Sequence, residues 1–494
     1  MSSMLKHHPL GQPIPDSVHA VCVSLPTMQD VIGYEEKRVE TLEQVKFAYP
    51  RFVFHDYVLR ATEWAAEQAG LVGQASYALC SVKAAQEMLE WMNLKQGGIT
   101  PCAGFVLAHF PSSPDACAKA KRYLQHTGTS ISSRQAEDCL HAAELLTERQ
   151  SEHRFKGSAE DHVIAALQQY LDTDQLALCA SGMNAFYASL KATQQVQRPR
   201  GKKVYLQLGW LYLDTMKILQ GFLSEDERVI VLHDVFDKAA IEAVFAEHGS
   251  NLAAVVTELP TNPLVQTPDV PHLSALCQQH RAVRIFDPSL AGVVNVDILE
   301  HTDFLPTSLT KYAANAGDVM AGLLAVNTQS PLAESLWSAV QREIEPPYIC
   351  DVQRLAEEIG EMPAVAAQVN HNARELAERL QTSDKIKRVY APCSGVSAHN
   401  YKTIARTDSS VGAIITVELN EPLSVFYDHA TVVKGPSFGT TYTMMCPFMY
   451  LAHYDLVSTS EGRSNLNDRG LDPDLLRLSV GTEPIEDIVS ALGL

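Results

Sequence analysis

The sequence contains no apolar run of the roughly 20 residues that a membrane-spanning helix needs. Its N-terminus has no apolar segment of the kind found in secretory signals. The 10 cysteines include no CxxC pair, which predicts reduced, buried thiols and neither a disulfide framework nor a zinc site. We therefore expect a protein with no membrane partner and no bound metal, located in the cytoplasm.

Runs of lysine or arginine are also missing, and the formal net charge is −19. Because nucleic-acid phosphates are bound through clustered basic residues, nucleic acid is not an expected partner. The 494 residues are 46% hydrophobic and 20% charged, the balance of a globular protein with two to four domains.

Four regions differ in pattern. Residues 1–60 are irregular and interrupted by prolines, which predicts an arm lying across another surface. Residues 61–150 have helical spacing, as in ASYALCSVKAAQEMLEWM, and predict a helical or mixed insertion. In residues 151–340 short β-rich runs alternate with helical stretches, which predicts an α/β domain with a mostly parallel sheet. Residues 341–494 predict a smaller α+β C-terminal domain. The predicted sheet strands are 176–181, 203–208, 228–233, 252–259, 282–287, 304–310 and 321–327.

A lysine and an aspartate follow two of these strands. Lys311 stands in the loop SLTK, where it can form a Schiff base with an aldehyde cofactor while Ser308 and Thr310 donate to the cofactor phosphate. Alone, this motif is more typical of an ordinary surface lysine. Asp287 ends another strand, and a carboxylate there can keep a pyridine nitrogen protonated. An aspartate before Pro288 is equally typical of a turn.

Three further motifs follow predicted strands. Ser181, Gly182 and Met183 stand between a strand and a helix, where the helix N-terminus can bind a phosphate. Asn262 in ELPTNP either contacts the ring oxygen of such a cofactor or marks a turn. Tyr212 either stacks on a planar ring or is an ordinary core tyrosine.

Together these motifs resemble a known family. ASGMNA, YLDT, ELPTNP, FDPS, SLTKYAANAGDVMAG and LLRLSVGTE stand in the order found in the cystathionine gamma-synthase group, type I fold enzymes of cysteine and methionine metabolism that use pyridoxal 5'-phosphate. The runs SLPT, GYEE, YPRF, KGPSFGTTYTMMCP and LAHY are similar to the fungal type of cystathionine gamma-synthase. The resemblance covers nearly the whole chain and is weakest at about 61–150.

The resemblance implies a cofactor role for each matched residue. Lys311 would bind pyridoxal 5'-phosphate covalently and move protons, and with Tyr212, which stacks on the ring, it would form the catalytic pair. Asp287 would pair with the ring nitrogen and Asn262 would contact the ring oxygen. The implied phosphate ligands are Ser181, Gly182, Met183, Ser308 and Thr310.

The resemblance also implies substrate contacts and an assembly. Arg477 would clamp the substrate α-carboxylate with its two-pronged guanidinium, and Ser437 would lie beside it. Tyr49 and Arg51 match a Tyr-x-Arg motif that reaches the phosphate from the neighbouring subunit. The implied assembly is a homodimer with shared active sites, and a tetramer by family tendency.

Some positions depart from the bacterial members of the group. Pro288-Ser289 replaces Asn-Thr after the aspartate, and Pro436 replaces a glutamate, as in the fungal-type sequences. The residues around Arg51 read YPRF in place of SRxxNPT. These changes leave the cofactor residues in place and leave the acyl donor and the second substrate open.

Three functions remain. The first is γ-replacement, in which an O-acylhomoserine reacts with a thiol, expected to be that of cysteine, to give cystathionine for methionine biosynthesis by transsulfuration. The second is a γ- or β-lyase, or a sulfhydrylase that takes sulfide or another nucleophile. The third is a cofactor-binding protein without turnover, which the presence of Lys311, Asp287 and Arg477 together disfavours.

Overall fold

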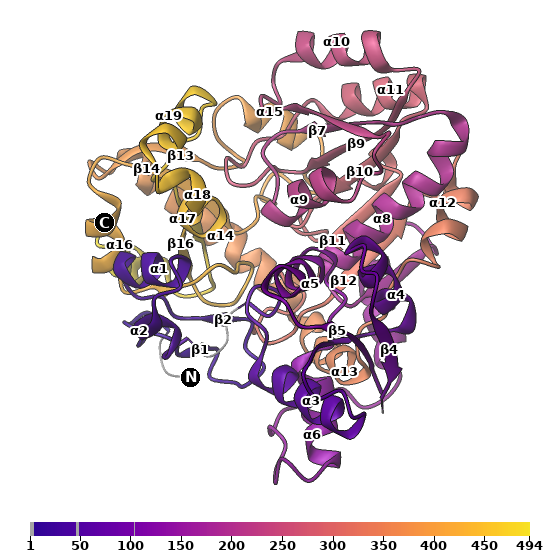
Figure 1. The fold of residues 1–494 in the computed structure, drawn as a ribbon. Coiled ribbons are helices and arrows are strands. Elements are labelled where there is room, and N and C mark those ends of the chain that lie inside the picture. The colour runs from indigo at the N-terminus through magenta and orange to yellow at the C-terminus, as the bar shows by residue number, and fades with distance from the viewer. Residues whose placement is uncertain (1–3, 46–48, 103) are drawn as a thin grey trace.

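The centre of the protein is a seven-stranded sheet (Figure 1). The computed structural model describes residues 4–45, 49–102 and 104–494. The strands stand in the order β6-β12-β11-β10-β9-β7-β8, and all neighbours are parallel except β12, which is antiparallel to β11 and β6. Each strand lies inside a segment predicted from the sequence, so the mostly parallel α/β fold is confirmed. The strands are β6 (Leu176–Cys179), β7 (Val204–Leu208), β8 (Arg228–Leu232), β9 (Leu252–Glu258), β10 (Val283–Asp287), β11 (Phe304–Ser308) and β12 (Gly322–Val326).

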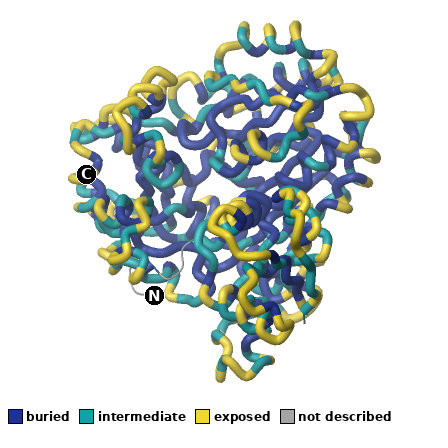
Figure 2. Tube along the Cα trace, viewed as in Figure 1, coloured by how far each residue is buried: buried dark blue, intermediate teal, exposed yellow. Residues whose placement is uncertain are grey.

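Helices cover both faces of this sheet, and alternate strand residues face opposite cores. Val255 of β9 packs in one core and Val256 in the other. Both cores are buried at the centre of the molecule (Figure 2). The first core contains α7 (Ala159–Gln168), α10 (Lys238–His248), α11 (Val270–His280) and α13 (Ile349–Glu358). The second contains α8 (Gly182–Gln197), α9 (Leu213–Gly221) and α12 (Ala333–Val340).

The insertion is a separate three-layer unit. Its antiparallel sheet has the order β3-β5-β4, with β3 (Gln74–Leu79), β4 (Gly98–Pro101) and β5 (Val106–Pro111). Ala108 faces α4 (Val82–Trp91) and α5 (Pro114–Thr127), and Leu107 faces α3 (Asp56–Gln68) and α6 (Ser133–Ala142). The segment ASYAL, expected to be helical, is strand β3, because pairing with β5 overrides its helical propensity.

The C-terminal part forms a second domain around the sheet β13-β14-β17-β16-β15. The arm packs on this domain of the same chain: Val31 shares a core with Phe426 and Tyr427. The arm elements are β1 (Pro13–Ile14), β2 (Cys22–Val23), α1 (Met28–Glu35) and α2 (Val39–Leu42). The domain elements are α14 (Met362–Thr382), β13 (Ile386–Tyr390), α15 (Ser397–Lys402), β14 (Ile414–Leu419), α16 (Leu423–His429), β15 (Val433–Lys434), β16 (Met444–Pro447), α17 (Phe448–Ala452), α18 (Tyr454–Val457), α19 (Ser460–Asp468), β17 (Leu476–Ser479) and α20 (Ile485–Leu492).

All 10 cysteines are free in the structure; five are buried, as predicted, four are half-buried and Cys393 is exposed. Within the part of the chain that the structure describes, no helix is both long and apolar enough to span a membrane. The same residues contain no cluster of histidine, cysteine and acidic side chains arranged to hold a metal ion.

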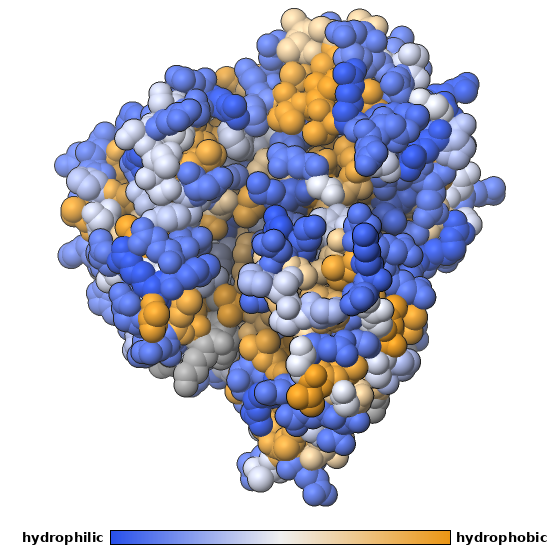
Figure 3. Space-filling model, viewed as in Figure 1, coloured by the Kyte–Doolittle hydropathy of each residue, from blue (hydrophilic) through white to orange (hydrophobic). Residues whose placement is uncertain are grey.

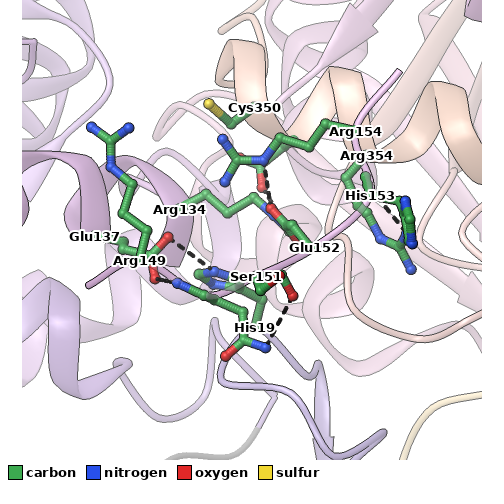
Figure 4. A network of polar contacts seen from close by, with 12 residues as sticks. His19, Arg134, Glu137, Arg149, Ser151, Glu152, His153, Arg154, Cys350 and Arg354 are labelled. Atoms are coloured by element: carbon green, nitrogen blue, oxygen red, sulfur yellow. Dashed lines mark hydrogen bonds and ion pairs between the residues drawn. The ribbon is translucent and has the colours of Figure 1, made fainter. Parts of the chain in front are cut away.

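A buried polar network joins the insertion to the arm and the large domain (Figure 4). Arg134 of α6 is 1% exposed, and its guanidinium contacts Glu152 Oε2 at 2.7 Å and Asp351 Oδ1 at 3.1 Å. On the same helix, Glu137 lies 3.4 Å from His19 of the arm. Three parts of the chain that are distant in sequence therefore meet around one helix.

Replacing Arg134 tests this network. Arg134→Ala should lower the free energy of unfolding by about 3–5 kcal/mol, because it leaves the carboxylate of Asp351 buried without its cation and removes one of the two arginines that pair with Glu152, the other being Arg154. The control is Arg149→Ala, which removes a half-exposed side chain ion-paired with Asp138 and should cost at most about 1 kcal/mol. Urea unfolding measures the free energy of unfolding of both variants. An equal loss in the two would contradict the structural role given to the Arg134 network.

Candidate active site

A pocket lies at the carboxyl edge of the large sheet, between the sheet, the arm and the C-terminal domain. The molecule is hollowed between the C-terminal domain and the rest (Figure 3). The pocket contains about 1240 Å³ of empty space, part of it open to solvent. It is lined by most of the predicted site residues: Tyr49, Arg51, Ser181, Gly182, Met183, Tyr212, Asn262, Asp287, Ser308, Lys311 and Arg477.

The amine of Lys311 is buried among aromatic rings. Lys311 Nζ donates to Ser437 Oγ at 2.7 Å and lies 4.8 Å and 4.7 Å from the ring centres of Tyr49 and Phe438. Ser437, predicted beside the substrate carboxylate, thus contacts the amine. Burial lowers the pKa of Lys311, and Tyr49 opposes this only in part. The neutral amine is the form that attacks an aldehyde or accepts a proton.

The backbone after Lys311 is held in a strained conformation. Tyr312 has φ 59°, a left-handed value that costs a non-glycine residue about 1–3 kcal/mol. Its amide donates to Gly439 O at 3.0 Å, and its hydroxyl donates to Leu290 O at 2.7 Å and accepts from Ala413 N at 2.9 Å. These bonds fix Tyr312 and, with it, the direction in which Lys311 leaves the chain.

Two carboxyl groups in the pocket end neighbouring parallel strands. Asp287 of β10 and Glu258 of β9 are partners in register. Burial raises the pKa of Asp287 to about 6, and burial together with Asp287 raises the pKa of Glu258 well above its usual value. Glu258 therefore holds the proton while Asp287 ionises. Among the residues described, no cation forms an ion pair with Asp287, so its charge is available to a protonated ring nitrogen.

The first turn of α8 forms the anion-binding part of the pocket. Ser181 caps the helix, accepting from Asn184 N at 3.0 Å. A Cβ on Gly182 would lie 2.8 Å from Ser308 Cβ, so only glycine lets the helix approach β11 this closely. The helix N-terminus thus presents its amides and positive dipole end to the pocket. Thr310, a predicted phosphate ligand, does not line the pocket, and its hydroxyl exchanges hydrogen bonds with the Ala321 backbone.

Arg51 and the two tyrosines lie together. Arg51 is 7% exposed, donates to Tyr212 Oη at 2.7 Å, and has its guanidinium carbon 5.5 Å from the ring centre of Tyr49. In the single chain, Tyr49 and Arg51 line the chain's own pocket. The resemblance implies that these two residues enter the pocket from a neighbouring subunit, and this stays a prediction.

The two tyrosines differ in acidity. Burial alone would raise the pKa of Tyr49, but Lys311 and Arg51 bring it below its ordinary value. Burial raises the pKa of Tyr212 well above the ordinary value despite Arg51. Tyr212 therefore stays protonated and suits stacking, and Tyr49 is the tyrosine better suited to proton transfer.

Arg477 of β17 is a buried cation without an ion-paired carboxylate among the residues described. It is 4% exposed, and it donates to Asn262 Oδ1 at 3.2 Å and to Pro436 O at 2.9 Å. The rings of Phe438 and Phe448 lie 5.1 Å from its guanidinium carbon. A planar, buried guanidinium with this surplus charge is suited to a substrate carboxylate.

Three carboxyl groups of the site were not predicted. Glu258 could have been found, because it ends the strand before Asp287 in a parallel sheet. Asp214 accepts from the Arg51 guanidinium. It stands in the YLDT motif, and the presence of a charged residue in that motif could have indicated it. Glu35 lines the pocket from the end of α1, and nothing in the sequence places the arm there.

These features fit pyridoxal 5'-phosphate. A buried amine, an ionisable aspartate at a neighbouring strand end and a helix N-terminus match its aldehyde, ring nitrogen and phosphate. Fold and site together define a pyridoxal-phosphate-dependent enzyme of the type I fold. The family model of the Cys/Met metabolism PLP-dependent enzymes matches residues 127–493, and the chain belongs to this family.

Known relatives cover nearly the whole chain. It is 37% identical over 481 residues to the L-2-amino-4-chloropent-4-enoate dechlorinase/desaturase of Streptantibioticus cattleyicolor, with 96% of this chain and 95% of that protein covered. It is 24% identical over 609 aligned positions to the cystathionine gamma-synthase of Neurospora crassa, with 97% of each covered.

Solved structures have the same fold. A cystathionine gamma-lyase of Micromonospora echinospora superposes with a TM-score of 0.58 at 23% identity, covering 71% of this chain and 89% of that one. The cystathionine gamma-synthase of Xanthomonas oryzae pv. oryzae, in complex with cystathionine, gives a TM-score of 0.56 at 19% identity, covering 70% and 87%.

Reduction with borohydride tests the assignment of Lys311. The holoenzyme should lose its visible cofactor absorption and carry the cofactor on the Lys311 peptide, and Lys311→Ala should show no such band. The control is Lys434→Ala: burial also lowers the pKa of Lys434, to about 8, but its amine donates to Pro26 O and Asp428 O away from the pocket. Peptide mass spectrometry identifies the lysine that carries the reduced cofactor, and cofactor found on Lys434 would refute the assignment of Lys311.

The pH dependence of cofactor binding tests Asp287. Since its pKa is raised to about 6, the carboxylate becomes neutral as the pH falls through 6 and loses its attraction for a protonated ring nitrogen. Pyridoxal 5'-phosphate affinity of the cofactor-free protein should therefore fall between about pH 7 and 5. Asp287→Asn should bind weakly throughout and lack this part of the pH dependence. If affinity depends on pH in the same way in the wild type and in Asp287→Asn, Asp287 does not pair with the ring nitrogen.

Proposed function

We propose that this protein catalyses γ-elimination, releasing a leaving group, most favourably chloride, from C4 of an α-amino acid. The observation that carries the proposal is the set of charges in the pocket. Three cations stand among the described lining residues, and each has its own role. Lys311 binds the cofactor, Arg51 pairs with Asp214, and Arg477 suits the α-carboxylate. A second amino acid such as cysteine finds no further cation for its own carboxylate in this set.

Much of the remaining pocket lining is apolar. Leu25, Phe52, Phe448 and Leu451 belong to it, which suits a short apolar chain carrying a halogen. The relative that is 37% identical is named for dechlorination and desaturation of L-2-amino-4-chloropent-4-enoate, and this substrate class is the one proposed here.

The protein's own residues supply binding and proton transfer. The bound cofactor supplies an electron sink that stabilises negative charge at the substrate Cα. Arg477 holds the α-carboxylate, which turns the Cα proton toward the amine of Lys311, the base, whose pKa burial lowers. Glu35, whose pKa burial raises to about 7, can exchange a proton near neutral pH. Overall, HCl leaves the substrate and one carbon–carbon π bond forms.

A second candidate is γ-replacement of an O-acylhomoserine by a thiol. It is supported by the similarity to a cystathionine gamma-synthase over 97% of both chains. Glu35 also favours it, because an ionised carboxylate there could pair with the ammonium group of an incoming amino acid.

We further propose, on the family resemblance, that the chain forms a homodimer or homotetramer. A shared site would require neighbouring copies to exchange the segment that carries Tyr49 and Arg51, since both reach the pocket within one chain. A monomer in light scattering at working concentration would refute the assembly.

Product analysis separates the two reactions. With L-2-amino-4-chloropent-4-enoate and no thiol, the holoenzyme should release chloride and give an amino acid lighter by HCl, measured by mass spectrometry. Arg477→Ala should lower kcat/KM by at least about tenfold, because a charge-assisted contact to the substrate is lost. The matched control is Arg463→Ala, whose half-exposed guanidinium pairs with Asp474 outside the pocket. Cystathionine formed from an O-acylhomoserine and cysteine, without chloride release, would establish the second candidate.

A further inference from the structure

The guanidinium of Arg51 is held by a cradle built from two other parts of the chain. Its Nη1 donates to Asp214 Oδ2 and, at 2.5 Å, to Gln125 O, and its Nη2 donates to Tyr212 Oη at 2.7 Å. Asp214 and Tyr212 belong to the large domain, and Gln125 belongs to α5 of the insertion. The orientation of Arg51 therefore depends on how the insertion meets the large domain.

Asp214 is the centre of the cradle. Its side chain is fully buried, and besides Arg51 it accepts from Gln125 Nε2 at 3.0 Å and His126 Nδ1 at 2.9 Å. Burial would raise the pKa of Asp214, but Arg51 and His126 bring it below the usual value. A carboxylate buried this fully and bonded on both oxygens fixes the position of its cation.

The end of α5 also touches the anion-binding turn. Gly128 follows the helix with φ 65°, and its carbonyl accepts from Ser181 Oγ at 3.4 Å. A Cβ on Gly128 would lie 2.0 Å from Ser181 Oγ, so only glycine lets the end of α5 approach Ser181 this closely. One short segment, residues 125–128, thus contacts both Arg51 and the first turn of α8.

Part of this segment lies outside the stretch shared with the family. The family model begins to match at residue 127, so Gln125 and His126 precede it. The insertion is also clamped to the large domain through the Arg134 network, which holds α6 against α13. The segment is therefore held in place beside Arg51 and Ser181.

We propose that the insertion serves the cofactor site: Gln125 and His126 hold the Asp214 carboxylate, and Asp214 aims Arg51 at the cofactor phosphate bound by the first turn of α8. These three are positioning residues for Arg51. The inference rests on the cofactor and is independent of which reaction the enzyme catalyses.

Titration of the cofactor-free protein tests the proposal with two probes, pyridoxal 5'-phosphate and pyridoxal, which lacks the phosphate. Asp214→Asn should raise the Kd for pyridoxal 5'-phosphate about tenfold, the effect of one lost charged hydrogen bond. Binding of pyridoxal should stay within about twofold. His126→Gln should act in the same direction by about threefold. The double variant Arg51→Ala/Asp214→Asn should bind no more weakly than Arg51→Ala, because Asp214 acts through Arg51.

The matched control is Asp226→Asn, which removes an exposed carboxylate paired with Lys203 and should change neither Kd. Unchanged affinity for pyridoxal 5'-phosphate in Asp214→Asn would overturn the proposal. Equal loss for both probes would also overturn it, since it would assign Asp214 a general structural role. If Asp214→Asn does not fold, as judged by circular dichroism, the same criteria apply to His126→Gln.

Discussion

The site is organised by buried charges that the protein does not neutralise by itself. Lys311 and Arg477 are cations without ion-paired carboxylates among the described residues, and the Asp287–Glu258 pair is acidic without a cation of its own. Burying such groups unpaired costs free energy, which appears as the lowered pKa of Lys311 and the raised pKa of both acids. The cofactor and the substrate supply the missing charges, so the same cost that destabilises the empty site favours the filled one.

Keeping these charges apart requires rigid support from every part of the chain. The parallel sheet fixes Asp287 and Glu258 in register, and the strained Tyr312 fixes the exit of Lys311. The C-terminal sheet supplies Arg477, and the arm supplies the aromatic wall and Arg51. The insertion, whose composition says little about a role, contacts Arg51 and Asp214 through the end of α5.

Much of the cofactor half of the site could be predicted, because its residues follow strands of a parallel sheet whose carboxyl ends share one edge. Ser181, Tyr212, Asn262, Asp287 and Lys311 all line the pocket. Thr310, predicted as a hydroxyl ligand of the phosphate, is not among the lining residues, and its hydroxyl bonds to the Ala321 backbone. The segment ASYAL shows the same limit, because its strand depends on a partner some 30 residues away.

The sequence by itself determined the mostly parallel sheet, because alternating strands and helices put short motifs at one edge whatever surrounds them. The resemblance of those motifs to a known family gave the cofactor, and Lys311 as its binding lysine remains a prediction. Only the tertiary structure decided which side chains complete the site. Glu35, Asp214 and His126 come from three distant elements, and they reach the site, with Asp214 hydrogen-bonded to His126, only once the arm and the insertion have packed on the large domain. Pairwise contacts of this kind leave no local pattern in a chain, so composition and spacing do not reveal them.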